Sequence, residues 1–228
     1  MEENKYLVPI AIIIAGALIG WGFYSSNGSE TKPSDMNNTE QVTQEPIKVN
    51  FKDSDHILGN PDAKIKIITF SDFECPYCSD FHKTMIQITD EYAKDGKVAW
   101  AMRQFPVHGV PTQIKAVASE CAGKLGGESK FWEMTDKIFE TTPTGWISVE
   151  ELPVLAMSLG LDTNDFNICL ENEDTNKKAQ EDFQNGIDLG IQGTPHSIII
   201  LESGEQIPLE GARPYDEIKG MIDMILAQ

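Results

Sequence analysis

The motif that most constrains this chain is Cys-Pro-Tyr-Cys at residues 75–78, because it stands between a predicted strand and a predicted helix. The β-branched run at residues 64–70 predicts the strand. After the motif, apolar residues recur at helical spacing up to Tyr92, and alternating apolar residues from Val98 predict a second strand. A strand, a helix and a strand within about 40 residues form a β-α-β unit with parallel strands. The sequence therefore predicts an α/β protein.

The residues of this motif are the predicted catalytic residues: Cys75, Pro76, Tyr77 and Cys78. Unpaired N–H groups at a helix N-terminus favour negative charge and so stabilise a thiolate at Cys75. The thiolate is the nucleophilic form of cysteine. Pro76 suits the first helical turn, because its missing N–H would be unpaired there. Cys78 lies one turn further along the helix, so the pair is predicted to switch between dithiol and disulfide.

A metal site and a purely structural disulfide are the other uses of such a cysteine pair. A structural zinc site takes four ligands, usually from a second cysteine pair or a close pair of histidines. His82 is the best additional ligand on the predicted helix, and the sequence has no second Cys-x-x-Cys. A Cys-x-x-Cys within a β-α-β unit is a specific redox signal. We therefore favour redox chemistry and predict no metal site and no bound cofactor.

The remainder of the folded part is predicted as helices, then a hairpin, then a last helix. Apolar stripes at helical spacing cover residues 114–125, 131–138, 152–159 and 166–170, and a polar helix follows at about 176–188. Residues 197–201 and 206–209 predict the hairpin, with Pro208 best tolerated on an edge strand. The last helix is predicted at Tyr215–Leu226.

Several ordered motifs resemble the DsbA-like family of thioredoxin-fold oxidoreductases. The first is the run at residues 73–82, which residues 59–63 precede. The family's later landmarks are matched in order at residues 120–122, 130–134, 169–170 and 193–195. The resemblance covers residues 51–228. It implies a thioredoxin-like α/β fold with a helical domain inserted at about residues 112–188.

The resemblance also implies that Thr194 and Pro195 bind substrate. It implies a cis peptide bond before Pro195, in a loop that faces the motif and exposes its backbone to an extended substrate segment. The chain departs from the family at Thr69, where relatives often carry a buried carboxylate that assists proton transfer. His196, directly after Pro195, is also less usual. We interpret it as a neighbour of Cys75 or, preferably, as a solvent-facing strand residue.

The second pair of cysteines, Cys121 and Cys169, falls on two apolar helical stripes. Two buried free thiols are one interpretation, because free cysteine behaves as a small apolar residue. The interpretation we favour is a structural disulfide that clamps the helical insertion. On the chain-entropy model such a bond would stabilise the fold by about 4 kcal/mol.

Residues 1–24 are predicted to form a transmembrane anchor. The almost uncharged segment at residues 7–23 would span about 25 Å as a helix, near the lower limit for crossing a bilayer. A cleaved signal peptide and a buried helix are the alternatives, although the segment lacks the positive start and the Ala-x-Ala site of a signal peptide. Residues 25–50 are polar with few apolar side chains, which predicts a flexible linker.

The charge balance excludes one large class of function. With 18 basic and 36 acidic residues, a net charge of −18, the chain has no basic run for binding nucleic acid. The motif and the resemblance predict a protein disulfide oxidoreductase, acting as a dithiol oxidase on reduced or unfolded substrate proteins.

The predicted location follows from the anchor and the cysteines. Disulfide chemistry fits an oxidising compartment, so the protein is predicted to be a single-pass membrane protein with an extracytoplasmic catalytic domain, periplasmic or at the cell surface. By family analogy a quinone-linked membrane partner would reoxidise it. The alternatives are a membrane-tethered reductase or isomerase, and a redox-inactive chaperone-like or metal-binding module.

Overall fold

The computed structural model describes residues 48–142 and 145–227. The predicted transmembrane segment, and the predicted linker up to residue 47, lie outside the described residues. Within the described ranges, no helix is both long enough and apolar enough to cross a membrane.

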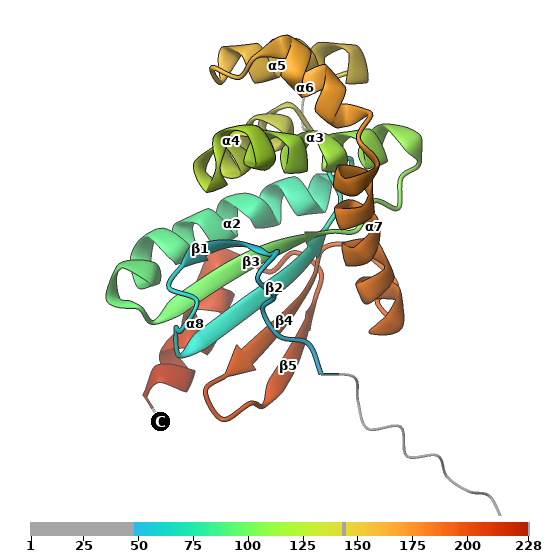
Figure 1. Cartoon of the computed structure of the whole chain (residues 1–228). Helices are drawn as coiled ribbons and strands as arrows, with labels where there is room; N and C mark the ends of the chain where they lie inside the picture. Colours follow the sequence, from blue (N-terminus) through green and yellow to red (C-terminus); the bar gives the residue numbers. More distant parts are fainter. Residues whose placement is uncertain (1–47, 143–144, 228) are drawn as a thin grey trace, which may run out of the picture. The chain divides into compact units, whose positions relative to one another are not determined.

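A five-stranded sheet forms the centre of the described domain (Figure 1). The strand order is β1-β3-β2-β4-β5, and the strands are β1 His56–Gly59, β2 Ile65–Ser71, β3 Val98–Gln104, β4 His196–Leu201 and β5 Gln206–Glu210. Strands β2 and β3 are parallel, with Ile65 opposite Val98, which confirms the predicted β-α-β unit. Strands β1, β4 and β5 pair antiparallel. Pro208 lies on the edge strand β5, where its missing N–H costs no ladder bond, as predicted.

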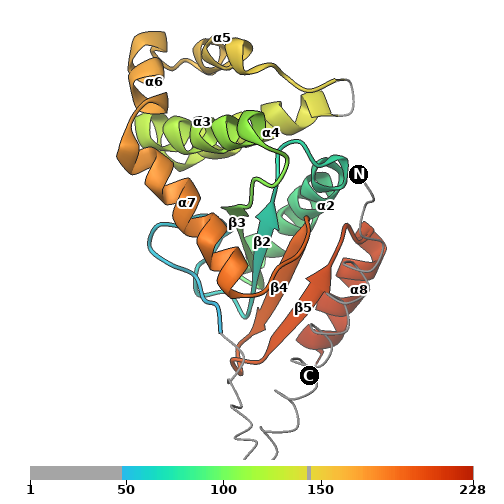
Figure 2. The same ribbon diagram turned by 90° about the vertical axis from the view of Figure 1, so that its right-hand side faces the viewer.

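Helices cover both faces of this sheet (Figure 2). Side chains of β2 alternate between the faces, so that Ile67 packs with α2 Pro76–Tyr92 and α8 Tyr215–Leu226, while Phe70 packs on the opposite side. Helix α7 Glu173–Asp188 covers that opposite side. It approaches closely at Gly186, where an added Cβ would lie 2.5 Å from the ring of Phe105. A larger residue at Gly186 would push α7 off the sheet.

The helical insertion stands at the end of the sheet from which β3 leads into α3 (Figure 1). Its helices before α7 are α3 Val110–Gly126, α4 Glu128–Thr141, α5 Leu152–Ser158 and α6 Thr163–Leu170. These helices confirm the stripes predicted from the sequence. Asp162 caps α6 and Asn172 caps α7, each by accepting two backbone N–H groups. These caps fix the N-terminal ends of α6 and α7.

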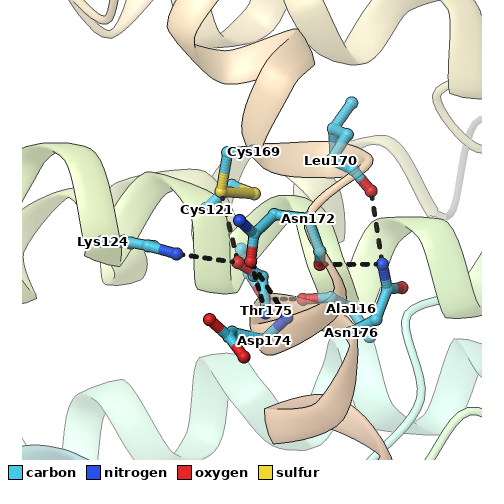
Figure 3. The surroundings of a disulfide bond; sticks show 10 residues. Ala116, Cys121, Lys124, Cys169, Leu170, Asn172, Asp174, Thr175 and Asn176 are labelled. Carbon is cyan, nitrogen blue, oxygen red and sulfur yellow. Dashed lines mark hydrogen bonds between the residues drawn. A yellow bond between two sulfur atoms is a disulfide. The ribbon is translucent and has the colours of Figure 1, made fainter.

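Cys121 of α3 and Cys169 of α6 form a disulfide (Figure 3). Their Cα atoms are 5.7 Å apart, and both residues are buried. The hydroxyl of Thr175 lies 3.5 Å from the Cys169 sulfur, and Thr175 also donates its backbone N–H to the capping residue Asn172. The bond thus ties α3 to the junction between α6 and α7.

Candidate active site

Cys75 lies at the N-terminus of α2. Its backbone is extended, and its carbonyl oxygen accepts the N–H of Cys78 at 3.0 Å and of Ser79 at 3.2 Å, which begins the helix. Pro76 takes the first turn, where no helical partner for its nitrogen is needed. The side chain of Tyr77 is 68% exposed, so its ring belongs to the surface around the motif.

The two cysteine sulfurs have different surroundings, although both thiols are free. Cys75 is 4% exposed, and its Sγ lies 3.4 Å from the carbonyl oxygen of Thr194, to which it donates when it is in the thiol form. Cys78 is fully buried, and its Sγ accepts the N–H of Asp72 at 3.5 Å. Of the two cysteines, only Cys75 keeps a small exposed fraction.

The same surroundings give the two thiols opposite pKa shifts. The pKa of Cys75 is lowered to about 6, chiefly by a hydrogen bond from the Cys78 thiol, while burial opposes the decrease. The hydroxyl of Thr194 and the N–H groups of Tyr77 and Cys78 lower the pKa further. Burial raises the pKa of Cys78 far above its ordinary value, and the Cys75 sulfur adds to the increase. Near neutral pH the reduced pair therefore holds a thiolate at Cys75 and a thiol at Cys78.

The Thr194–Pro195 peptide bond is cis, as the resemblance implied. The loop that carries it contacts the motif through the Cys75–Thr194 hydrogen bond. A groove of about 480 Å³ opens beside this loop and is lined by residues 190, 192–196, 210 and 211. His196 lines this groove and is half-buried, so the preferred prediction of a solvent-facing side chain holds only in part.

Asp72 is a candidate functional residue whose role the sequence left undecided. Its buried carboxylate accepts bonds from three segments. Oδ1 accepts the N–H of Glu74 at 2.7 Å and the hydroxyl of Thr112 at 2.9 Å. Oδ2 accepts the N–H of Val107 at 2.6 Å and lies 3.0 Å from Nδ1 of His108. One carboxylate thus fixes the loop before the motif, the β3–α3 loop and the first turn of α3.

Helix α3 holds the same loop through a second contact. Lys115 is only 1% exposed, and its Nζ lies 2.9 Å from Oε1 of Glu74, the residue directly before Cys75. A buried ammonium group is costly unless it is paired, so we expect Lys115 to keep its contact with Glu74. The helical insertion therefore contributes to the position of the nucleophile.

Thr69, at which the sequence departs from the resemblance, is buried. Its hydroxyl lies 2.8 Å from that of Ser197 and accepts the indole N–H of Trp100 at 3.0 Å. This cluster is neutral and contains no group that titrates near neutral pH. The carboxylates near the motif are instead those of Asp72 and Glu74.

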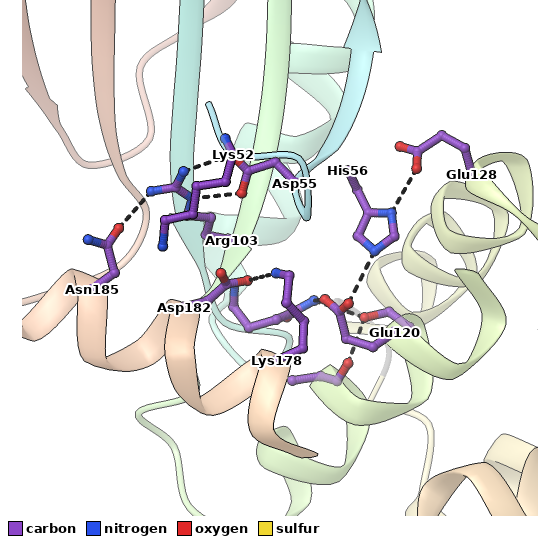
Figure 4. A network of polar contacts seen from close by, with 12 residues as sticks. Lys52, Asp55, His56, Arg103, Glu120, Glu128, Lys178, Asp182 and Asn185 are labelled. Carbon is purple, nitrogen blue, oxygen red and sulfur yellow. Dashed lines mark hydrogen bonds and ion pairs between the residues drawn. The ribbon is translucent and has the colours of Figure 1, made fainter. Parts of the chain in front are cut away.

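A second polar network joins the sheet to the helical insertion (Figure 4). The guanidinium of Arg103 on β3 makes two hydrogen bonds to Asp55, at 2.9 and 2.7 Å. His56 on β1 contacts Glu120 of α3 at 3.1 Å and Glu128 of α4 at 2.8 Å. Burial lowers the pKa of His56, but these two carboxylates outweigh it and raise the pKa to about 9. At neutral pH His56 is therefore a cation between two carboxylates.

Among the residues that the structure describes, the side chains do not form a candidate metal site. No group of three or more His, Cys, Asp or Glu residues is placed to hold a metal ion there. His82, the extra ligand considered from the sequence, instead lies with Nε2 2.6 Å from Oδ1 of Asp136.

Comparisons with known proteins agree with this geometry. A family model described as thioredoxin matches residues 52–224. The probable disulfide bond formation protein D of Bacillus anthracis is 29% identical over 144 residues, and the match covers 60% of this chain and 66% of the relative. The crystal structure of oxidised BdbD from Bacillus subtilis is 26% identical with a TM-score of 0.66, over 76% of this chain and 94% of that one. The crystal structure of Wolbachia pipientis alpha-DsbA1 shares the fold, with a TM-score of 0.69 at 22% identity. The match covers 78% of this chain and 93% of that chain. The chain therefore belongs to the thioredoxin family, and within it the chain is similar to disulfide bond formation protein D and to DsbA proteins.

Proposed function

We propose that this protein is a dithiol oxidase that forms disulfides in reduced or unfolded substrate proteins through Cys75 and Cys78. The observation that carries the proposal is the placement of Cys75 at the N-terminus of α2, one turn before the buried Cys78, and this placement is accompanied by a lowered pKa of Cys75. Stabilising a thiolate favours the reduced pair, so the oxidised pair gives up its disulfide readily. The names of relatives, disulfide bond formation protein D among them, support this direction.

The proposed reaction has two exchange steps. A substrate thiolate attacks Sγ of Cys75 in the oxidised enzyme, which breaks the Cys75–Cys78 bond and releases the sulfur of Cys78. Because the pKa of Cys78 is high, that sulfur takes up a proton. A second substrate thiolate then attacks the substrate sulfur of the mixed disulfide and releases Cys75 as a thiolate. Two electrons pass from the substrate dithiol to the enzyme, and the substrate keeps the new disulfide.

Thr194 and Pro195 are proposed to bind the substrate segment around its reacting cysteine. The contact between Thr194 and Cys75 supports this, because it brings the backbone of the loop next to the reacting sulfur. An extended segment can use such backbone groups irrespective of its sequence.

The proposed location is the outer side of a cell membrane, with residues 1–24 as a single-pass anchor. An oxidising compartment keeps disulfide exchange running in this direction. Each turnover leaves the enzyme reduced, so a quinone-linked membrane partner is proposed to accept its two electrons. In membranes without quinone, the oxidised enzyme should still react once with its substrate but should not turn over again. That result would support this partner.

The test of the proposed function uses the full-length protein, a reduced unfolded substrate and three variants. Wild type should form disulfides in the substrate, and Cys75→Ser should abolish that activity. Cys78→Ser has no disulfide of its own to donate, so its Cys75 is first converted to the mixed disulfide with glutathione by oxidised glutathione. A substrate thiolate should then displace glutathione from Cys75 and give an enzyme–substrate adduct on a non-reducing gel, which Cys78, being absent, cannot resolve. The Cys75→Ser/Cys78→Ser variant is the control and should form no adduct. Full activity of Cys75→Ser would refute the proposal.

A further inference from the structure

The groove beside the Thr194–Pro195 loop has a chemical character that points to a class of substrate segment. We propose that it takes a basic side chain near the substrate cysteine, with the carboxylate of Glu210 as the partner of that side chain. The inference rests on the proposed function, because it concerns the segment whose sulfur bonds to Cys75.

The groove lies within reach of the residues that flank a bound substrate cysteine. Thr194 lines the groove, and its carbonyl oxygen is 3.4 Å from Sγ of Cys75. An extended chain advances by about 3.3–3.6 Å per residue. Residues one to three positions from the substrate cysteine therefore come alongside the groove, whose volume of about 480 Å³ has room for a long side chain.

Among the residues that line the groove, only His196 and Glu210 carry titratable side chains. They stand opposite each other where β4 pairs with β5. Burial lowers the pKa of His196, so its imidazole is neutral at neutral pH. Glu210 is exposed, and its carboxylate gives the groove a single negative charge. The other lining groups are glycine, proline, amide and hydroxyl groups, which suit a polar side chain.

The nearest cation along the chain, Arg213, is engaged elsewhere. Its Nε donates to the backbone carbonyl of Glu210 at 3.1 Å, and its Nη1 lies 3.3 Å from the carboxylate of Glu217. Within the described ranges, no ion pair involves the side chain of Glu210. That carboxylate is therefore available to a lysine or arginine of the substrate.

The test must separate this local effect from the net charge of −18, which attracts basic peptides to the whole molecule. Glu205 provides the matched control, because it is exposed at the opposite end of the same β-hairpin, next to the turn. Glu210→Gln and Glu205→Gln remove the same charge from the full-length protein. Both are compared with wild type on three dithiol peptides that differ only in the residues flanking each cysteine: arginine, glutamine or glutamate.

The readout is the rate at which each peptide reduces the oxidised Cys75–Cys78 pair, followed by quenching with an alkylating reagent and mass measurement. In wild type the arginine peptide should react about five-fold faster than the glutamate peptide, because Glu210 attracts the arginine and repels the glutamate. A ratio of this size is typical of one exposed charge contact. Glu210→Gln should reduce this ratio to about two-fold or less, the part due to net charge. Glu205→Gln should keep the ratio of wild type.

Equal ratios in the two variants would overturn the inference, because the preference would then come from net charge alone. Equal rates for the three peptides in wild type would also overturn it and leave the oxidase proposal standing. Failure of every peptide to reduce the enzyme disulfide would reject the proposed function, and this inference with it.

Discussion

At the scale of single residues, the chemistry depends on a difference between two sulfurs one helical turn apart. Cys75 has its pKa lowered to about 6 by hydrogen bonds from the Cys78 thiol, the Thr194 hydroxyl and backbone N–H groups. Cys78 is held in the protonated form by burial. The nucleophile and the protonated partner are therefore assigned by their surroundings, since the two side chains are chemically identical.

The largest contribution to this low pKa can be tested by substitution. In reduced wild type, alkylation of Cys75 should lose its rate as the pH falls through about 6, because the thiolate becomes protonated. Cys78→Ala removes the donor and should move that midpoint up by about one unit, the size expected for one hydrogen bond to a charged group. Cys78→Ser keeps a donor and should move it less. A wild-type midpoint near 8.5, the value of an unperturbed cysteine, would contradict this account.

Asp72 allows a second test at this scale. Asn in its place would turn an N–H donor toward groups that are themselves donors, such as the N–H of Val107. Leaving buried donors without acceptors costs about 1–3 kcal/mol, so Asp72→Asn should lower the free energy of unfolding by about 2 kcal/mol in urea titrations. Thr112→Val, which removes one of the contacts, should cost about 1 kcal/mol. Unchanged stability of Asp72→Asn would show that the carboxylate does not organise this loop.

At the scale of helices and strands, the disulfide between α3 and α6 is the clearest covalent element of the insertion. Replacing Cys121 and Cys169 by Ser should lower the free energy of unfolding by about 4 kcal/mol on the chain-entropy model. The Cys75→Ser/Cys78→Ser variant, left unreduced and denatured, should bind no thiol reagent. Two reactive thiols in that variant would show that the bond is not formed in the protein.

Most elements could be predicted because their signals are local. The strand before the motif, α2 and α8 have regular apolar patterns and clear ends, and they match the structure closely. Strand β1 was missed, because His56–Gly59 is four residues long and shows no alternation. Its place comes from pairing with β3, with partners 40 to 46 residues later, from His56 opposite Met102 to Gly59 opposite Ala99.

The difference between local signals and contacts that are distant in the sequence also explains which parts of the site could be predicted. Cys75 and Cys78 are recognisable because the motif and its place before a helix are contiguous in the sequence. The importance of Asp72 could not be predicted, since its partners Val107, His108 and Thr112 lie 35, 36 and 40 residues away. An aspartate three residues before the first cysteine was the only local signal, and many loops contain one. The polar groove likewise forms only when β4 and β5 bring His196 opposite Glu210.

At the scale of the described domain, buried charges link the sheet to the helical insertion. His56 on β1 lies between carboxylates of α3 and α4, and Arg103 on β3 pairs with Asp55 and donates to Asn185 of α7 at 2.6 Å. Breaking one partner of such a pair leaves a buried charge without compensation. The position of the insertion, and hence of its contacts to Asp72 and Glu74, therefore depends on these ion pairs.

This link predicts a pH dependence of stability. The pKa of His56 is raised from 6.5 to about 9 on folding. A raised pKa contributes stability that is fully present below about 6.5 and is lost as the pH rises through about 9. Oxidised wild type, in which Cys75 does not titrate, should lose about 2 kcal/mol of unfolding free energy between pH 6.5 and pH 9.5 relative to His56→Gln. Parallel pH profiles of the two proteins would contradict the assignment.

The most direct test of the central claim is the reduction potential of the Cys75–Cys78 pair. The full-length protein would be equilibrated across glutathione ratios, and the fraction of the pair in the reduced form measured after acid quenching and alkylation. The account predicts a potential above about −200 mV, because the stabilised thiolate of Cys75 favours the reduced pair. A value near −270 mV, about that of thioredoxin, would contradict it and make the protein a reductase.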